Sequence, residues 1–320
     1  MSGPALALHG GAGAFSSARI PAQRVQEMRS DLGVALAAGM AILERGGPAL
    51  EAVVAAVRVL EDSRVFNAAR GAVLRRDGSV RLDASVMCGA SQRAGAVSLV
   101  RRVQNPVQLA RAVLEREQEV LLCGDDADEL AAELGLPLQP PAYFITDYRA
   151  SQLERLRQRA SAASADASGD GAEPAEEEGQ TVGAVALDAA GHLAAATSTG
   201  GTTNARVGRI GDSPILGAGT WACDASCAVS ATGAGEFFLR AAFAHDLHAR
   251  SVWQGVSLDT AARQALAHVV QLGGHGGCVA LDRHGNLAAP FTTLAMPRAY
   301  QNGAGQRRVC VLEPDEPSPA

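Results

Sequence analysis

Aromatic residues are scarce in this sequence, which has 320 residues and only 4% Phe, Trp and Tyr. A chain with so few large rings has to build its core from Ala, Val and Leu. Charged residues are also few, at 19%, and the 28 basic residues are outnumbered by 34 acidic ones. A net charge of −6 provides no basic footprint, so we expect no nucleic-acid partner.

Long apolar runs are absent too, and none approaches the about 20 residues needed to cross a bilayer. The first residues, MSGPALALHGGAGAF, lack the charged start and long apolar stretch of a secretion signal. The six Cys residues are dispersed, and no His or second Cys pair stands at zinc-site spacing from Cys223 and Cys227. These absences predict no membrane partner and reduced thiols in a cytoplasmic protein.

Several nucleotide and hydrolase motifs are missing. A strand is expected at Ala5 to Leu8, followed by the glycine loop His9-Gly10-Gly11-Ala12-Gly13. This loop has neither the GxGxxG spacing nor the Lys-Ser/Thr end of a phosphate-binding loop. An esterase oxyanion loop would need a GxSxG elbow, which the chain does not contain. A tight turn between packed elements is the simplest interpretation.

The most informative stretch begins at Thr181 and reads TVGAVALDAAGHLAAATSTGG. Its first part is an apolar run of strand length, residues 182–187. Asp188 to Gly191 then supplies a turn, and His192 to Thr199 reads as a second strand. The preceding run, 161–180, is polar and of low complexity, so we expect it to be disordered. A flexible segment thus leads directly into a hairpin that starts with Thr.

A Thr in that place has two interpretations. It can be an ordinary residue at the start of a strand. Alternatively, a cut between Gln180 and Thr181 would give Thr181 a free α-amino group, with a pKa of about 8, as its own base. An N-terminal Thr of this kind is a known nucleophile.

The remaining pattern alternates strands and helices. A hairpin is expected at 73–86, turning at Asp77-Gly78, and the pattern GxVALD occurs at both 183–188 and 277–282, which indicates two similar hairpins in neighbouring sheets. Helices are expected at 21–45, 50–60, 105–117, 125–134, 148–159, 233–250 and 258–271. This order suits an α+β fold in which helices cover two stacked, mainly antiparallel sheets.

Further polar residues form candidate sites. The Arg209 fork can bind a carboxylate and Asp212 can accept from an ammonium group, so together they can hold an amino-acid zwitterion, or they form a surface salt bridge. Thr232 and Gly233 offer a hydroxyl and a backbone N–H at an expected helix start, where negative charge is favoured. A dinucleotide loop there would need a third glycine. Thr199 ends the second strand and can return beside Thr181.

Five segments resemble one known family. They are LHGGAGAF (8–15), FNAARGAVL (66–74), the stretch 181–201, TNARVGRIGDSPILGAGTWA (203–222) and SATGAGEFFLRA (230–241). In this order they resemble the plant-type asparaginases, also called isoaspartyl peptidases, which are Thr-dependent N-terminal nucleophile hydrolases. The resemblance implies one structural domain, a four-layer αββα sandwich, self-cleaved into an α-subunit of residues 1–180 and a β-subunit of 181–320.

The resemblance also implies roles for residues. Thr181 would be the nucleophile, Thr199 its hydrogen-bond partner, and Thr232 with Gly233 the oxyanion hole. Substrate binding would involve four residues: Arg209 for the α-carboxylate, Asp212 and Gly235 for the ammonium group, and Asn67 as a support. The implied activity releases aspartate from asparagine and β-aspartyl dipeptides through an acyl-enzyme. A glycosylasparaginase-like or aminopeptidase-like relative, or a non-cleaving amino-acid-binding protein, are the alternatives.

The chain departs from the family at two positions. The family usually has Gly before the nucleophile, where this chain has Gln180, and Gly where it has Ala69, which matters if that backbone needs a positive φ. The resemblance further implies an assembly of two α and two β chains and no organic cofactor. It also implies a structural sodium ion bound by backbone carbonyls, and the matching positions are Leu60, Glu61, Ser63, Phe66, Ala68 and Arg70.

Overall fold

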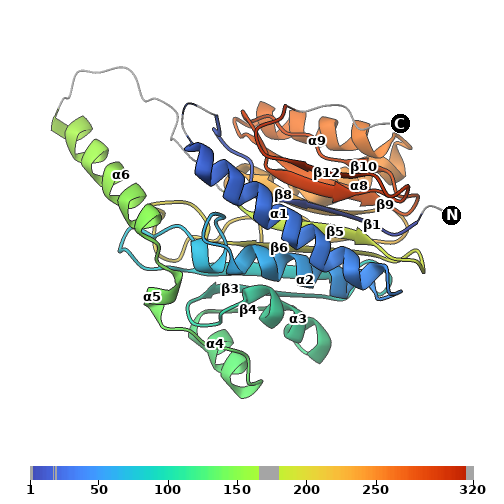
Figure 1. Cartoon of the computed structure of the whole chain (residues 1–320), viewed down its shortest axis with the longest axis horizontal. Coiled ribbons are helices and arrows are strands. Elements are labelled where there is room, and N and C mark those ends of the chain that lie inside the picture. The colour runs from blue at the N-terminus through green and yellow to red at the C-terminus, as the bar shows by residue number, and fades with distance from the viewer. Residues whose placement is uncertain (1–2, 17, 19, 166–179, 315–320) are drawn as a thin grey trace.

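Two stacked β-sheets form the centre of the protein (Figure 1). The computed structural model describes residues 3–16, 18, 20–165 and 180–314. Within these residues, an eight-stranded sheet has the order β12 (Arg307–Cys310), β11 (Arg298–Gln301), β1 (Ala5–His9), β5 (Val182–Leu187), β6 (Leu193–Thr199), β2 (Leu82–Cys88), β3 (Ala94–Val100) and β4 (Leu121–Cys123). The four-stranded sheet has the order β10 (Leu287–Ala288), β9 (Gly276–Asp282), β8 (Cys227–Gly233) and β7 (Thr220–Ala222). Apart from the parallel pair β3–β4, the named strands pair antiparallel.

Helices cover the outer face of each sheet (Figure 1). On the large sheet lie α1 (Ala22–Leu43), α2 (Ala49–Asp62) and α3 (Pro106–Arg116), with α4 (Gly124–Glu133) near β3. On the small sheet lie α7 (Gly235–Ala241), α8 (Phe243–Trp253) and α9 (Leu258–Gln271). Three shorter or peripheral elements complete the order: the 3₁₀ turn η1 (Ala69–Gly71), α5 (Pro141–Phe144) and α6 (Asp147–Ala165). The expected four-layer αββα sandwich is confirmed.

The alternation of side chains along each strand explains the layers. In β1, Leu6 and Leu8 join the core beneath helices α1 and α2, whereas Ala5 and Ala7 face the small sheet. In β5 and β6 the odd-numbered residues Val185, Leu187, Leu193 and Ala195 point between the sheets. By the same parity, Thr181, Thr197 and Thr199 lie on the inter-sheet side. Small side chains such as Ala allow the two sheets to approach closely.

Most elements expected from the sequence are present. The two GxVALD hairpins are β5–β6 in the large sheet and β9–β10 in the small sheet. Helix α9 has the expected bounds, because Ser257 caps it by accepting a hydrogen bond from the Thr260 N–H at 3.3 Å. The other helices of the first half agree to within a few residues.

Three local expectations were wrong. The Asp77-Gly78 turn exists, but no strand precedes it, since β2 begins at Leu82 and pairs with β3 and β6. The single helix expected at 233–250 is two helices, because Ala242 takes a left-handed conformation with φ 46°. The helix expected to end at Arg159 continues to Ala165, so the first residues of the expected disordered run are helical. At its other end, Gln180 is buried. The rest, 166–179, lies outside the described residues.

In the part of the chain that the structure describes, no helix is both long and apolar enough to cross a membrane.

Glu61 ties three elements together at the end of α2. Its Oε1 accepts from the Ser198 hydroxyl of β6 at 2.6 Å and from the Val107 N–H in the first turn of α3 at 3.0 Å. The side chain is fully buried. Burial raises the pKa of this carboxyl from 4.5 to about 8, although the hydrogen bonds from Ser198 and Val107 work against that rise.

A raised pKa makes stability depend on pH. The folded chain keeps the Glu61 carboxyl protonated up to a higher pH than the unfolded chain does. This residue therefore favours folding below pH 4.5, and that contribution is lost as the pH rises from 4.5 to about 8. In a Thr181→Ala background, which removes the hydroxyl that the expected cut would use, Glu61→Gln should therefore stabilise the protein more at pH 8.5 than at pH 5. The effect of Glu61→Gln on the free energy of unfolding should change by up to about 1.4 kcal/mol per pH unit.

Urea unfolding of Thr181→Ala and of Thr181→Ala with Glu61→Gln, at pH values from 5 to 8.5, measures this difference in stability. Glu154→Gln, at an exposed helix position, is the charge-matched control and should show no such trend. A Glu61→Gln effect independent of pH would mean that the carboxyl does not titrate in this range.

Candidate active site

Thr181 lies at the start of β5, in the layer between the two sheets, and is only 4% exposed. Its Oγ1 donates to the Thr199 Oγ1 at 3.1 Å, and the Ser213 Oγ lies 3.5 Å away. The antiparallel pairing of β5 with β6 brings the two Thr residues together, as the sequence predicted. Ser213 was not predicted, and its only sequence signal is its place next to Asp212.

The Thr199 hydroxyl is itself fixed by the backbone. Its Oγ1 also accepts from the Gly201 N–H at 3.0 Å. Asn67 then holds the Gly201 carbonyl through its Nδ2 at 2.7 Å, while its Oδ1 accepts from the Val73 N–H at 2.9 Å. Asn67 therefore supports the turn that carries Thr199, in agreement with the supporting place expected for it.

Thr232 lies on the facing strand, β8, and its hydroxyl accepts from two backbone N–H groups. One belongs to Thr181, at 3.3 Å, and the other to Ala12 in the glycine loop, at 3.1 Å. The first is the nitrogen of the peptide bond between Gln180 and Thr181. Thr232 thus contacts the nitrogen that the expected cut would release.

Gly233 was expected at a helix start, and this expectation was wrong. It is the last residue of β8 and pairs with Gly276 of β9, while α7 begins at Gly235. A side-chain carbon at position 233 would stand 2.4 Å from the His275 carbonyl oxygen, so the site requires Gly. Its N–H therefore projects from a strand end and not from a helix.

Arg209, Asp212 and Gly235 lie together beside this layer. A side-chain carbon at position 235 would stand 2.7 Å from the Asp212 Oδ1 and 2.9 Å from the Arg209 Nη2. The Arg209 fork does not bind Asp212. Its Nε and Nη2 donate to the two carboxylate oxygens of Glu236, at 2.8 and 2.9 Å. The sequence did not predict this partner.

Asp212 is buried, at 3% exposed, and its Oδ2 has no hydrogen-bond partner among the described residues. Burial raises the pKa of this carboxyl to about 7, and the neighbouring Arg209 charge opposes the rise. A buried carboxylate oxygen without a donor is suited to receive one from a ligand. An ammonium group is the donor that would also remove its charge penalty.

A chain of buried hydroxyls continues from the site through the inter-sheet layer. It runs from Ser85 to Thr220 (2.7 Å), Thr197 (2.6 Å), Ser230 (2.8 Å) and the His9 Nε2 (3.0 Å). All five residues are fully buried. Burial lowers the pKa of His9 to about 3, so its ring is neutral at ordinary pH. Side chains alternate along a strand, and this alternation directs these polar residues between the sheets. Sequence reasoning missed that signal.

Arg75 and Asp83 form a second unpredicted pair, with 3.9 Å between the Arg75 Nη2 and the Asp83 Oδ2. Both side chains are fully buried, and a side-chain carbon at Gly201 would stand 2.8 Å from the same Nη2. The Arg75 guanidinium therefore packs directly behind the turn that follows Thr199.

The positions expected to bind sodium lie on the irregular segment from the end of α2 to η1. Ala69 has a φ of 39° there, so the backbone does need the positive value that Gly usually supplies. The Leu60 carbonyl accepts from the Ser63 N–H at 3.3 Å and the Ala68 carbonyl from the Gly71 N–H at 3.1 Å. Each carbonyl has a second lone pair, so these contacts leave room for a cation, and the sodium site stays a prediction.

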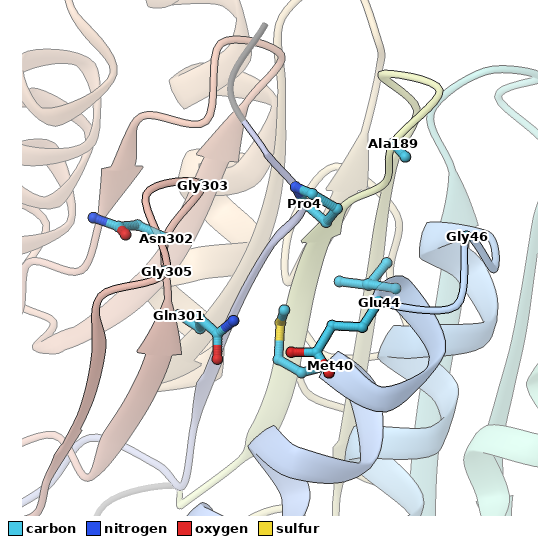
Figure 2. Close-up of a pocket in the computed structure, with 10 residues that line it drawn as sticks. Pro4, Met40, Glu44, Gly46, Ala189, Gln301, Asn302, Gly303 and Gly305 are labelled. Carbon is cyan, nitrogen blue, oxygen red and sulfur yellow. The ribbon is translucent and has the colours of Figure 1, made fainter.

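A separate pocket of about 360 Å³ opens at the far end of β1 (Figure 2). Pro4, Met40, Glu44 and Gln301 are among the residues around it. Among the described residues that line it there is no Ser, Thr, Cys, His or Lys. It therefore offers none of the hydroxyl nucleophiles found between the sheets.

Comparison with known proteins agrees with this geometry. The profile of the asparaginase family matches residues 2–311. An isoaspartyl peptidase of Escherichia coli (strain K12) is 45% identical over 296 residues, which cover 92% of each chain. An isoaspartyl peptidase/L-asparaginase of Mus musculus is 39% identical over 308 residues, covering 96% of this chain and 90% of the mouse chain. A probable isoaspartyl peptidase/L-asparaginase 2 of Arabidopsis thaliana is 34% identical over 335 residues, covering 98% and 100%. The chain therefore belongs to the asparaginase family.

Proposed function

We propose that this protein is a self-cleaving Thr amidohydrolase that releases L-aspartate from L-asparagine and from β-aspartyl dipeptides. The names of its relatives support this substrate class. The observation that carries the mechanism is the double contact of Thr181: its hydroxyl donates to Thr199, and its N–H donates to Thr232. Both the attacking oxygen and the nitrogen to be released are therefore fixed.

Self-cleavage uses these same atoms. The Thr181 hydroxyl oxygen adds to the carbonyl carbon of Gln180, and the carbon–nitrogen bond then breaks. The nitrogen takes up the hydroxyl proton and becomes the α-amino group of Thr181. Water hydrolyses the resulting ester, which leaves a carboxylate on Gln180 and restores the hydroxyl. The products are residues 1–180 and 181–320, within one structural domain.

Turnover repeats this chemistry on the substrate. The new α-amino group takes the proton of the Thr181 hydroxyl as it attacks the side-chain amide. Thr232 and the Gly233 N–H stabilise the oxyanion of the tetrahedral intermediate. Ammonia or the leaving amino acid departs with the proton, and water then releases aspartate from the ester.

Substrate capture relies on charge. Arg209 binds the α-carboxylate through its fork, and Asp212 with the Gly235 carbonyl receives the α-ammonium group. In the structure the carboxylate of Glu236 occupies this fork. Glu236 is partly exposed, so it can turn into solvent when a substrate carboxylate arrives.

Two further properties rest on the family resemblance. The cut chains should associate as two α and two β chains, which light scattering of the matured protein measures. Sodium should bind to backbone carbonyls of residues 60–70. Sodium chloride should then raise the melting temperature more than lithium chloride at the same concentration.

One prediction of this mechanism concerns the cut. Wild-type protein should give two bands on a denaturing gel, and the smaller fragment should begin TVGAVALD. Thr181→Ala should give one uncut and inactive chain, because the attacking oxygen is gone. Thr199→Ala is the companion variant and should cut more slowly, since only the partner of the hydroxyl is lost. Full activity in a single uncut chain would remove Thr181 from its role.

A second prediction concerns the substrate carboxylate. Arg209→Ala should still cut itself but lose most of its kcat/KM on both asparagine and a β-aspartyl dipeptide. Loss of one partner of a buried, charged hydrogen bond amounts to about 2–5 kcal/mol. Arg206→Ala, in the exposed part of the same loop, is the control and should stay near wild type. Normal kcat/KM in Arg209→Ala would rule out this assignment.

The pH dependence of kcat/KM provides a third prediction. Only ionised Asp212 attracts an ammonium group, so kcat/KM of the matured enzyme should fall as the pH drops below about 7. The Thr181 amino group, with an ordinary pKa of about 8, acts in the same direction. Asp212→Asn should lower kcat/KM at pH 8 and abolish the lower of the two transitions. A variant profile that retains both transitions would contradict the role of Asp212.

A further inference from the structure

Gln180 is the residue whose carbonyl carbon would be attacked, and its side chain is held inside the protein. It is 5% exposed, and its Oε1 accepts from the Nη2 of Arg149 at 3.0 Å. Arg149 is fully buried in the first turn of α6. The later turns of this helix extend away from the two sheets (Figure 1). The contact therefore joins the base of α6 to the peptide bond at the active site.

The same guanidinium contacts one other element, η1, and a residue of its own helix. Its Nε donates to the Gly71 carbonyl at 2.8 Å, and its Nη1 donates to the Gln152 Oε1 at 3.0 Å. Gly71 ends η1, a few residues after Asn67, which supports the turn behind Thr199. The position of Arg149 is thus set relative to the partner of the nucleophile, and not by α6 alone.

The backbone of Gln180 is confined as well. Gly11 has a φ of 104°, and a side-chain carbon there would stand 2.8 Å from the Gln180 Cα. The glycine loop therefore packs directly on this residue. On its C-terminal side, the Thr181 nitrogen is fixed to Thr232. With the side chain also bound, rotation about both backbone bonds of Gln180 is restricted.

We propose that Arg149 is a positioning residue for self-cleavage, which holds the Gln180–Thr181 peptide in reach of the Thr181 hydroxyl by binding the Gln180 side chain. Gln cannot adopt all the backbone conformations open to Gly, so an attack geometry that Gly reaches freely needs an outside contact here. A charged donor in a buried site makes that contact stronger than a neutral one. The proposal rests on the self-cleavage proposed above and assigns its control to the side chain before the cut.

A double-mutant cycle tests this. Wild type, Arg149→Met, Gln180→Gly and the double variant are made by pulse-labelled cell-free translation, and the conversion of full-length chain into two fragments is timed. Arg149→Met should slow the cut of the Gln180 chain by at least about tenfold, the range for a hydrogen bond to a charged group. In the Gln180→Gly background the same change should matter less than about twofold, because no side chain remains to be held.

Two variants of Gln180 provide a matched pair that leaves Arg149 intact. Gln180→Glu keeps an acceptor for the guanidinium and should cut at close to the wild-type rate. Gln180→Leu is similar in size but has no acceptor, and should be as slow as Arg149→Met. Arg149→Lys should recover part of the rate. This pair decides the matter if Arg149→Met fails to fold, as judged by its melting curve in the Thr181→Ala background.

The outcomes separate the two proposals. Equal slowing by Arg149→Met in both backgrounds would show that Arg149 only supports the fold, and a fast cut in Gln180→Leu would show that the held side chain is irrelevant; either result overturns the positioning role. Both leave self-cleavage itself intact if wild type is cut before Thr181. A wild-type chain that is never cut there would overturn self-cleavage and, with it, the positioning role.

Discussion

The structure depends on one constraint: the space between the two sheets has to provide hydrogen-bond partners for the hydroxyl groups buried in it. Strand parity directs Thr181, Thr197 and Thr199 into that space, and Ser230 and Thr232 enter it from the facing sheet. A buried hydroxyl without a partner destabilises the fold by about 1–3 kcal/mol. The hydroxyls therefore bind one another and nearby backbone groups, which fixes each rotamer. A nucleophile in such a network is oriented before any substrate arrives.

Glycine makes this crowding possible at one decisive point. A side-chain carbon at Gly183 would stand 1.8 Å from the Ser230 Oγ and 2.8 Å from the His9 Nε2. The hydrogen bond between Ser230 and His9 therefore passes directly across β5, next to Thr181. Because burial keeps His9 neutral, the ring adds no charge to the layer.

What the sequence could predict was what local pattern determines. The hairpins follow from GxVALD and its turns, and α9 follows from Ser257 and an apolar stripe. The motif order located Thr181, Thr199, Thr232 and Asn67, which the structure does bring together. It also located Arg209, Asp212 and Gly235 as neighbours.

Sequence reasoning failed where distant segments decide the outcome. Gly233 precedes a helix in the sequence, yet its pairing with Gly276 keeps it in a strand. Arg149 carries no motif, and only the tertiary structure brings α6 next to Gln180. At Ala69 the family usually has Gly, and this departure pointed to a position where a positive φ matters. The structure has a positive φ there.

In the proposed substrate site, the charges of the side chains nearly cancel. The Arg209 fork is balanced by Glu236, and the raised pKa of Asp212 allows it to keep its proton near neutral pH. A zwitterion reverses both conditions at once, because its carboxylate replaces Glu236 and its ammonium group favours ionised Asp212. The exchange leaves the number of ion pairs at these side chains unreduced while the Glu236 carboxylate returns to water. A ligand with only one of the two charges would leave either the Asp212 Oδ2 without a donor or Arg209 still bound to Glu236, so the electrostatics of these three side chains favour a ligand that carries both charges.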